Sequence, residues 1–316
     1  MPNYSGSWNL VQQMQAVAAY NWPGSIAPGT FAIFALGCTS SASTTRDKYT
    51  FSGCVVSSGA AASAASSSGA ATGSSSVGIF ALGLINFCFS STRNKYTYSS
   101  CTSSSATSSS ANSYYGSAAG NSTVGIFALG RSPSSSASAN RDKYTYSADT
   151  NATATSASAT AYRGSAVGTS TVGIFALGSV SPCGPSTTRN KYTYSGCVNA
   201  TATAASAASQ SGSAVGNSTV GIFALGYVGG DSTTRNKYTY SGDTNVVATA
   251  STNASSQGSA AGNSTTGIFA LGYVGGVSTI RNKYTYSGCV NASGTAATVA
   301  STWGSAASNG TCGVNV

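Results

Sequence analysis

Few side chains in this sequence could take part in chemistry. The 316 residues include eight cysteines, fourteen Lys and Arg, five acidic residues and no histidine. All five acidic residues are aspartates. Acid–base catalysis near neutral pH usually employs His or a carboxylate of raised pKa, and His is also the commonest metal ligand. The composition therefore argues against an enzyme, and we predict no catalytic residue, no metal site and no cofactor.

The cysteines fall into two classes that occur together. One class closely follows a recurring Tyr-Thr pair (Cys54, Cys101, Cys197 and Cys289), and the other follows a recurring IFALG string (Cys38, Cys88 and Cys183), with Cys312 left over near the C-terminus. This pattern suggests disulfides Cys38–Cys54, Cys88–Cys101, Cys183–Cys197 and Cys289–Cys312, each stabilising the fold by roughly 3 kcal/mol for a loop of about 15 residues. Pairing between repeats and free, buried thiols are the alternatives. A zinc site is not expected, because no CxxC spacing occurs.

The net charge of +9 is distributed along the chain at regular intervals. Arg and Lys two residues apart on a strand point to the same side, so repeated pairs would form a ring of cations. Such a ring could bind an anionic polymer, or it could join neighbouring repeats by hydrogen bonds to carbonyls and by stacking on tyrosines. We favour the structural role and do not expect nucleic acid as a partner. The ring comprises Arg46, Lys48, Arg93, Lys95, Arg141, Lys143, Arg189, Lys191, Arg235, Lys237, Arg281 and Lys283.

An internal repeat positions all of these residues. IFALG begins at residues 33, 79, 126, 174, 222 and 268, with spacings of 46, 47, 48, 48 and 46 residues. Each repeat contains a glycine-bounded apolar run such as Gly125–Gly130 and an alternating run such as Lys191–Ser195, both typical of strands. Weaker strands are expected near Ser117–Gly120 and Val246–Thr252.

Four short strands in about 47 residues are typical of a β-propeller blade. A β-solenoid is the alternative, but its coils are usually shorter. We therefore predict an all-β propeller of about six four-stranded blades over residues 24–316. In an idealised blade the two cysteine classes lie at opposite ends of the third strand, so a disulfide within one repeat requires its loop to fold back. An enzyme on this scaffold needs a cluster of unlike polar residues that interrupts the repeat, and none is evident in the sequence.

The two ends of the chain differ from the repeats. Gly304–Asn309 copies the start of a repeat, and we expect it to complete the first blade and close the ring, rather than to enter a partner subunit. Residues 1–23 contain Trp8, Leu10, Met14 and Trp22, which predict a short amphipathic segment for capping or attachment. No signal peptide or transmembrane run is visible, so no membrane insertion is expected.

These blades, with a glycine-flanked apolar strand and a Tyr-bearing strand, resemble the kelch-like propellers of tailed bacteriophage virion proteins. The leader, with Tyr4–Leu10 followed by Asn21–Pro23, is similar to that of virion-attached phage proteins. The resemblance implies a non-enzymatic tail fibre, appendage or capsid decoration protein. It implies attachment to other virion proteins through residues 1–23, a homo-oligomer, a host surface glycan as ligand, and a virion or extracellular location.

The alternative function is an extracellular adhesin or a self-assembling filament subunit. We expect contacts in the most variable loops, Leu84–Ser91, Arg131–Asn140 and Ser179–Ser186.

Overall fold

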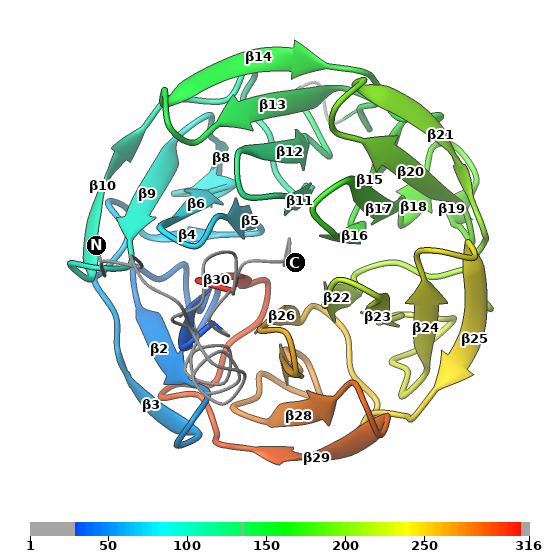
Figure 1. Cartoon of the computed structure of the whole chain (residues 1–316). Helices are drawn as coiled ribbons and strands as arrows, with labels where there is room; N and C mark the ends of the chain where they lie inside the picture. Colours follow the sequence, from blue (N-terminus) through cyan, green and yellow to red (C-terminus); the bar gives the residue numbers. More distant parts are fainter. Residues whose placement is uncertain (1–28, 134–135, 311–316) are drawn as a thin grey trace, which may run out of the picture.

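The computed structural model describes residues 29–133 and 136–310. They form six four-stranded antiparallel sheets arranged around one axis, together with two small three-stranded sheets (Figure 1). The predicted all-β propeller is therefore confirmed, with six blades. In this described part, no helix is long and apolar enough to cross a bilayer. The predicted attachment segment, with Trp8, Leu10, Met14 and Trp22, lies outside the described residues.

Each blade runs from a strand at the axis to a strand at the rim (Figure 1). From inside outwards, blade 1 consists of β30 (Ser305–Ser308), β1 (Phe31–Ala35), β2 (Arg46–Thr50) and β3 (Val55–Ser58), and blade 2 of β5 (Ala70–Gly73), β6 (Val77–Ala81), β9 (Arg93–Thr97) and β10 (Thr102–Ala106). Blade 3 consists of β11 (Ser117–Gly120), β12 (Val124–Ala128), β13 (Arg141–Thr145) and β14 (Thr150–Ala154), and blade 4 of β16 (Ser165–Gly168), β17 (Val172–Ala176), β20 (Arg189–Thr193) and β21 (Val198–Ala202). Blade 5 consists of β22 (Ser213–Gly216), β23 (Val220–Ala224), β24 (Arg235–Thr239) and β25 (Thr244–Ala248), and blade 6 of β26 (Ser259–Gly262), β27 (Thr266–Ala270), β28 (Arg281–Thr285) and β29 (Val290–Gly294).

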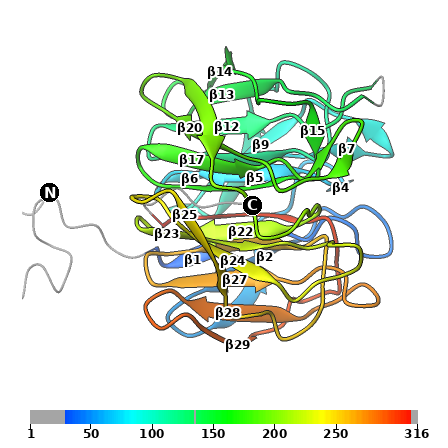
Figure 2. The ribbon, with the colours of Figure 1, turned by 90° about the vertical axis from the view of Figure 1, so that its right-hand side faces the viewer.

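Two smaller sheets lie at one end of the propeller, towards the right in Figure 2. The first consists of β4 (Ser66–Ser67), β7 (Leu84–Ile85) and β8 (Cys88–Phe89). The second consists of β15 (Ala161–Tyr162), β18 (Ser179–Val180) and β19 (Gly184–Pro185). In each sheet, two of the three strands belong to a variable loop: β7 and β8 to Leu84–Ser91, and β18 and β19 to Ser179–Ser186.

Residue size decides where each strand lies in a blade. The innermost strands are made of small residues, and all four residues of β11 are buried, because six strands converge on the axis. The second strands carry the apolar VGIFA-type segment and are also buried. Gly125 in β12 must be a glycine, since a Cβ there would lie 2.5 Å from Thr72 of the neighbouring blade. The rim strands are polar and largely exposed, as in β14.

The C-terminal strand closes the ring. β30 pairs antiparallel with β1, with Ala32 opposite Ser308 and Ala35 opposite Ser305. The side-chain oxygen of Asn309 then accepts hydrogen bonds from the backbone N–H groups of Thr30 (2.8 Å) and Phe31 (3.0 Å). The prediction that this segment completes the first blade is confirmed, and its pairing partner belongs to the same chain.

A buried arginine from each blade reaches into the next blade. Its Nη2 donates a hydrogen bond of 2.8–3.2 Å to an Asn or Asp on the third strand of that blade. Its guanidinium also lies 4.3–4.7 Å from the centre of a phenylalanine ring there. The hydrogen-bonded pairs are Arg46–Asn94, Arg93–Asp142, Arg141–Asn190, Arg189–Asn236, Arg235–Asn282 and Arg281–Asp47. The last pair joins blade 6 to blade 1, so the series forms a closed circle.

Four of these buried guanidinium groups have a neutral amide as the third-strand partner in place of a carboxylate. Burial lowers the pKa of Arg141 to about 10. The charge is held by donated hydrogen bonds to Asn190 and Asn199 and by the face of Phe175. The neighbouring blade therefore solvates the arginine, which couples the two blades.

Replacing one ring arginine should destabilise the whole propeller. We expect Arg141→Met to lower the free energy of unfolding by roughly 2–4 kcal/mol, because buried amide oxygens lose their donor. Arg131→Met, at a partly exposed arginine outside the ring, is the matched control, with an expected loss below about 1 kcal/mol. Denaturant unfolding measures both, and equal losses would contradict the coupling role of Arg141.

Candidate functional site

Six residues at one end of the axis form a hollow that we call the axial mouth. Each one directly precedes the glycine before an innermost strand, and together with those glycines they line an open hollow. The six side chains are of five types, although the surrounding strands repeat. In the order of blades 1 to 6, the mouth residues are Trp303, Ser68, Tyr115, Arg163, Ser211 and Gln257.

The backbones of the mouth residues form a closed ring of hydrogen bonds. The N–H of each mouth residue donates to the carbonyl oxygen of the mouth residue in the preceding blade, over 2.8–2.9 Å. Ser68 donates to Trp303 in this way, and Trp303 donates to Gln257, so the circle is complete. All six residues have a φ between 54° and 59°. A left-handed backbone costs a non-glycine residue on the order of 1 kcal/mol, yet no blade has glycine there.

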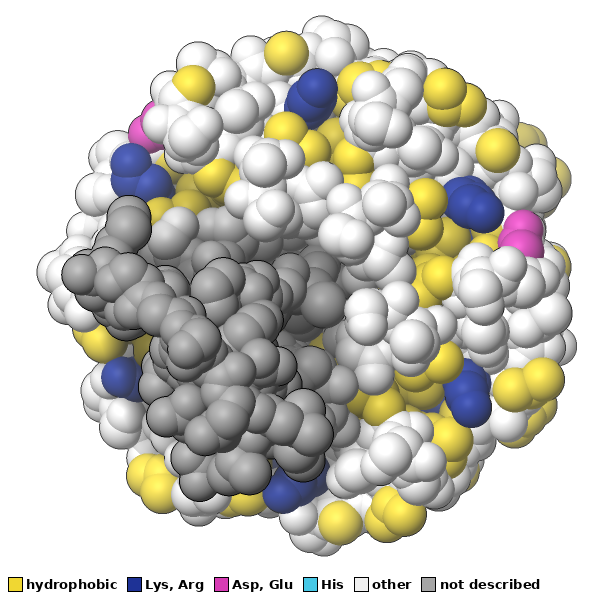
Figure 3. All heavy atoms as spheres, in the orientation of Figure 1, with side chains coloured by type: hydrophobic (Ala, Val, Ile, Leu, Met, Phe, Trp, Pro, Cys, Tyr) yellow, Lys and Arg dark blue, Asp and Glu magenta, His cyan; other side chains and the backbone are white. Residues whose placement is uncertain are grey.

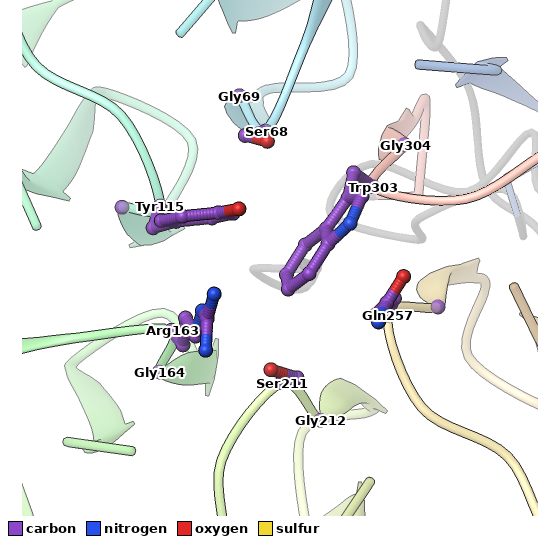
Figure 4. A pocket seen from close by; sticks show the side chains of 12 residues that line it. Ser68, Gly69, Tyr115, Arg163, Gly164, Ser211, Gly212, Gln257, Trp303 and Gly304 are labelled. Atoms are coloured by element: carbon purple, nitrogen blue, oxygen red, sulfur yellow. The ribbon is translucent and has the colours of Figure 1, made fainter. Parts of the chain in front are cut away.

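The three largest mouth side chains meet across the axis (Figure 4). The ring centres of Tyr115 and Trp303 are 4.6 Å apart, although these residues come from blades 3 and 1. The guanidinium of Arg163 lies 4.7 Å from the Tyr115 ring centre and 5.3 Å from that of Trp303. Ser68, Ser211 and Gln257 complete the rim with hydroxyl and amide groups. The mouth thus combines aromatic faces, one cation and neutral polar groups.

Aromatic side chains continue from the mouth onto blades 2 to 4. Tyr114 lies 4.4 Å from Tyr115 and 4.8 Å from Phe89, measured between ring centres. The guanidinium of Arg131 lies 4.4 Å from the ring centre of Tyr162. Phe89 belongs to the loop Leu84–Ser91, and Arg131 begins the loop Arg131–Asn140. Two of the three variable loops in which contacts are predicted therefore lie beside the mouth.

The axial mouth was missed in the sequence analysis. No cluster that interrupts the repeat is evident in the sequence, whereas the structure brings six such residues of five types together, two of them aromatic. A signal was available: Gly-Ser-Ala recurs in five repeats, and a different residue precedes it in each of the five. Single variable positions spaced about 47 residues apart do not look like a cluster until the ring brings them together.

A second ring, at the opposite end of the strands, contains the predicted lysines. The lysines are half-buried, whereas the arginines of the same motif are buried. Each lysine side chain extends towards the residue at the turn between the third and fourth strands of the next blade, which we call the turn residue. In chain order the turn residues are Cys54, Cys101, Asp149, Cys197, Asp243 and Cys289. Figure 3 shows this end, with lysines (dark blue) around the ring and acidic side chains (magenta) beside two of them.

The predicted disulfides are not present among the described residues. Cys38, Cys54, Cys88, Cys101, Cys183, Cys197 and Cys289 are all free. Cys38 follows β1 and Cys54 follows β2. Because β1 and β2 are antiparallel, the two cysteines lie at opposite ends of β2, whose five residues span about 16 Å. A disulfide needs Cα atoms within about 7 Å. Cys312, the predicted partner of Cys289, lies outside the described residues.

Asp149 shows what the turn position binds. Its carboxylate accepts hydrogen bonds from the Thr107 backbone (2.9 Å), from the Tyr144 hydroxyl, and from Lys95 Nζ of blade 2 (3.3 Å). Burial alone would raise the pKa of Asp149, but these donors outweigh it and lower the pKa to about 2. The pKa of Asp243 is lowered in the same way, with Tyr238, Thr203 and Lys191 as the favourable partners. The turn position is therefore built to hold a negative charge.

The lowered pKa of Asp149 predicts a loss of stability in acid. A carboxylate whose folded-state pKa lies below its usual 3.8 stabilises the fold above that value. This stabilisation is lost as the pH falls from about 4 to about 2. Asp149→Asn should reduce the fall in unfolding free energy over this window, measured by denaturant titration at each pH. Asp231→Asn is the control, because no ion pair involves Asp231 in the described chain, and an unchanged profile for Asp149→Asn would count against the assignment.

Within residues 29–133 and 136–310, no group of three or more Cys, Asp, Glu or His side chains is placed to hold a metal ion. Comparison of the chain with models of known protein families and with curated protein sequences found no significant match.

Proposed function

We propose that this protein is a non-enzymatic virion structural protein whose propeller binds a saccharide on the host surface through the axial mouth. The observation that carries this proposal is the set of six side chains, of five types, held on one repeated backbone ring. Attachment to the virion through residues 1–23, display as a tail fibre, appendage or capsid decoration, and a homo-oligomeric, extracellular particle are parts of the proposal. They rest on the resemblance to phage propellers.

The backbone geometry of the mouth supports a binding role for its side chains. The inter-blade hydrogen bonds use only N–H and carbonyl groups, so the scaffold does not require any particular side chain. Glycine would relieve the left-handed backbone at each of the six positions. Trp303, Tyr115 and Arg163 are nevertheless large, and they differ. A ligand that is contacted from several blades accounts for side chains that are both costly and different.

The chemistry of the mouth favours a saccharide. The flat, apolar faces of Trp303 and Tyr115 suit the C–H face of a sugar ring, since such aromatic rings combine large contact area with a polar edge. Gln257 and the two serines supply neutral donors and acceptors for hydroxyl groups. Arg163 can bind a carboxylate or a hydroxyl oxygen.

A nucleic acid fits this end less well. Binding a phosphate backbone requires cations that follow the strand. Near the mouth, Arg131 and Arg163 are partly exposed cations. The ring lysines lie at the opposite end of the strands. A filament formed by exchange of terminal strands is also not favoured, because β30 pairs with β1 of its own chain.

Binding to arrayed bacterial surface saccharides tests the mouth directly. Trp303→Ala should weaken binding at least tenfold, because the largest stacking surface is removed. Tyr273→Ala is the matched control, since Tyr273 is 37% exposed and lies outside the mouth. Thermal unfolding of each variant shows whether the fold is kept. Unchanged saccharide binding by a folded Trp303→Ala protein would reject the mouth as the site.

The virion assignment has a separate test. Native mass spectrometry together with electron cryo-imaging of material from the native source should find the chain on discrete particles as a defined oligomer. Continuous fibres made of this chain would instead support a filament subunit. This result does not depend on saccharide binding, so the two parts of the proposal can fail separately.

A further inference from the structure

Four of the six inter-blade contacts at the turn residues join a lysine to a cysteine. The Nζ–Sγ distances are 3.5 Å for Lys48–Cys101 and Lys283–Cys54, and 3.8 Å for Lys143–Cys197 and Lys237–Cys289. In the remaining two contacts the turn residue is an aspartate, as in the Lys95–Asp149 ion pair. A lysine therefore meets either a carboxylate or a thiol at every joint of the ring.

The aspartates show that this position stabilises an anion. The tyrosine of the same blade and the lysine of the preceding blade both donate to the Asp149 carboxylate. In the four blades with a cysteine at the turn, the equivalent tyrosine and lysine are present in the sequence and the lysine nitrogen lies against the sulfur. The thiol also donates to the carbonyl oxygen three residues before it, and the tyrosine hydroxyl has no hydrogen-bond partner there. The thiolate is the nucleophilic and oxidisable form of cysteine. These four cysteines each have a lysine nitrogen within 3.5–3.8 Å, whereas for the exposed Cys88 and Cys183 no lysine contact is present among the described residues.

We propose that each of these four lysine–cysteine pairs forms a covalent sulfur–nitrogen bond between neighbouring blades when the protein meets a peroxide. The thiolate attacks one peroxide oxygen, giving a sulfenic acid and hydroxide when the peroxide is hydrogen peroxide. Sulfur is thereby oxidised by two electrons and the peroxide is reduced. Hydroxide takes a proton from the lysine ammonium, and the amine lone pair attacks sulfur. The S–N bond forms, the S–O bond breaks, and water leaves.

The geometry suits this step. The reacting atoms are already within 3.5–3.8 Å, and the flexible lysine stem can shorten the distance by side-chain rotation. The lysines are half-buried at an open end of the molecule, which a small neutral oxidant can reach (Figure 3). Each product is a sulfenamide, which has lost two hydrogen atoms relative to the free pair.

The Lys283–Cys54 pair has a special place, because it joins blade 6 to blade 1. The two residues are 229 positions apart in the sequence. β30 closes the ring by pairing with β1 through hydrogen bonds alone. A bond between Lys283 and Cys54 would add a covalent link between blade 6 and blade 1. The proposed modification therefore locks the circle after folding is complete.

Peptide mapping by mass spectrometry of the full chain, before and after treatment with hydrogen peroxide, tests the proposal. We expect four cross-linked peptide pairs, each with the summed mass less two hydrogen atoms, and their reversal by a thiol reductant. Cys88 and Cys183 serve as internal controls and should carry added oxygen without a link to lysine. If Cys54, Cys101, Cys197 and Cys289 remain reduced, gain only oxygen, or form links of another mass, the proposal is wrong.

A matched variant separates this chemistry from a folding effect. Cys54→Asp introduces the residue already present at positions 149 and 243, so the variant should fold and keep an ion pair with Lys283. After peroxide treatment it should lack the Lys283–Cys54 link and keep the other three. The untreated proteins should unfold at similar temperatures, whereas the treated Cys54→Asp protein should unfold at a lower temperature than the treated parent. Equal values for the treated proteins would overturn the role of this link in closing the ring.

Discussion

The structure depends on the arginine that each blade extends into the next. Apolar side chains of the second and third strands pack between neighbouring blades, whereas the innermost strand of each blade consists of small residues. The buried guanidinium adds a polar link, since it packs against a phenylalanine and donates to amide or carboxylate oxygens in the adjacent sheet. If a blade were separated from its neighbour, the buried amide or carboxylate oxygens that accept hydrogen bonds from this arginine would lose their donor. The blades are therefore stable as a closed set, and the Arg281–Asp47 pair gives the first and last blades the same joint as the others.

The two ends of the molecule use the repeat differently. At the axial mouth, backbone atoms make the inter-blade hydrogen bonds, so the six side chains are free to differ. At the turn residues, side chains make the inter-blade contacts, so their chemistry is restricted to a carboxylate or a thiol beside a lysine. Mouth residues vary because backbone atoms make the contacts between blades there. Turn residues vary little because their side chains make those contacts. The mouth and the lysine contacts at the turn residues consequently lie at opposite ends of the strands.

The repeat made the architecture predictable, because IFALG and the Arg-x-Lys motif recur with a blade-like period and each carries strand periodicity. The closing role of Gly304–Asn309 was predictable for the same reason. The disulfides Cys38–Cys54, Cys88–Cys101 and Cys183–Cys197 were predicted wrongly, since cysteines that occur together were taken to be paired. The structure instead relates Cys54 and its equivalents to Asp149 and Asp243, through a lysine supplied by another blade. The mouth was not predictable from local patterns, because Trp303 and Tyr115 meet only through the curvature of the whole ring.

The circle of backbone bonds beneath Trp303, Ser68, Tyr115, Arg163, Ser211 and Gln257 has an evolutionary consequence. A point mutation at any of these codons changes a side chain of the mouth and leaves the backbone hydrogen bonds between blades in place. Under the proposed saccharide-binding role, a lineage carrying this gene could therefore reach new receptors in single steps, with little loss of folded protein at each step. Six independent positions on one rim also allow partial changes, so an old specificity can weaken while a new one strengthens.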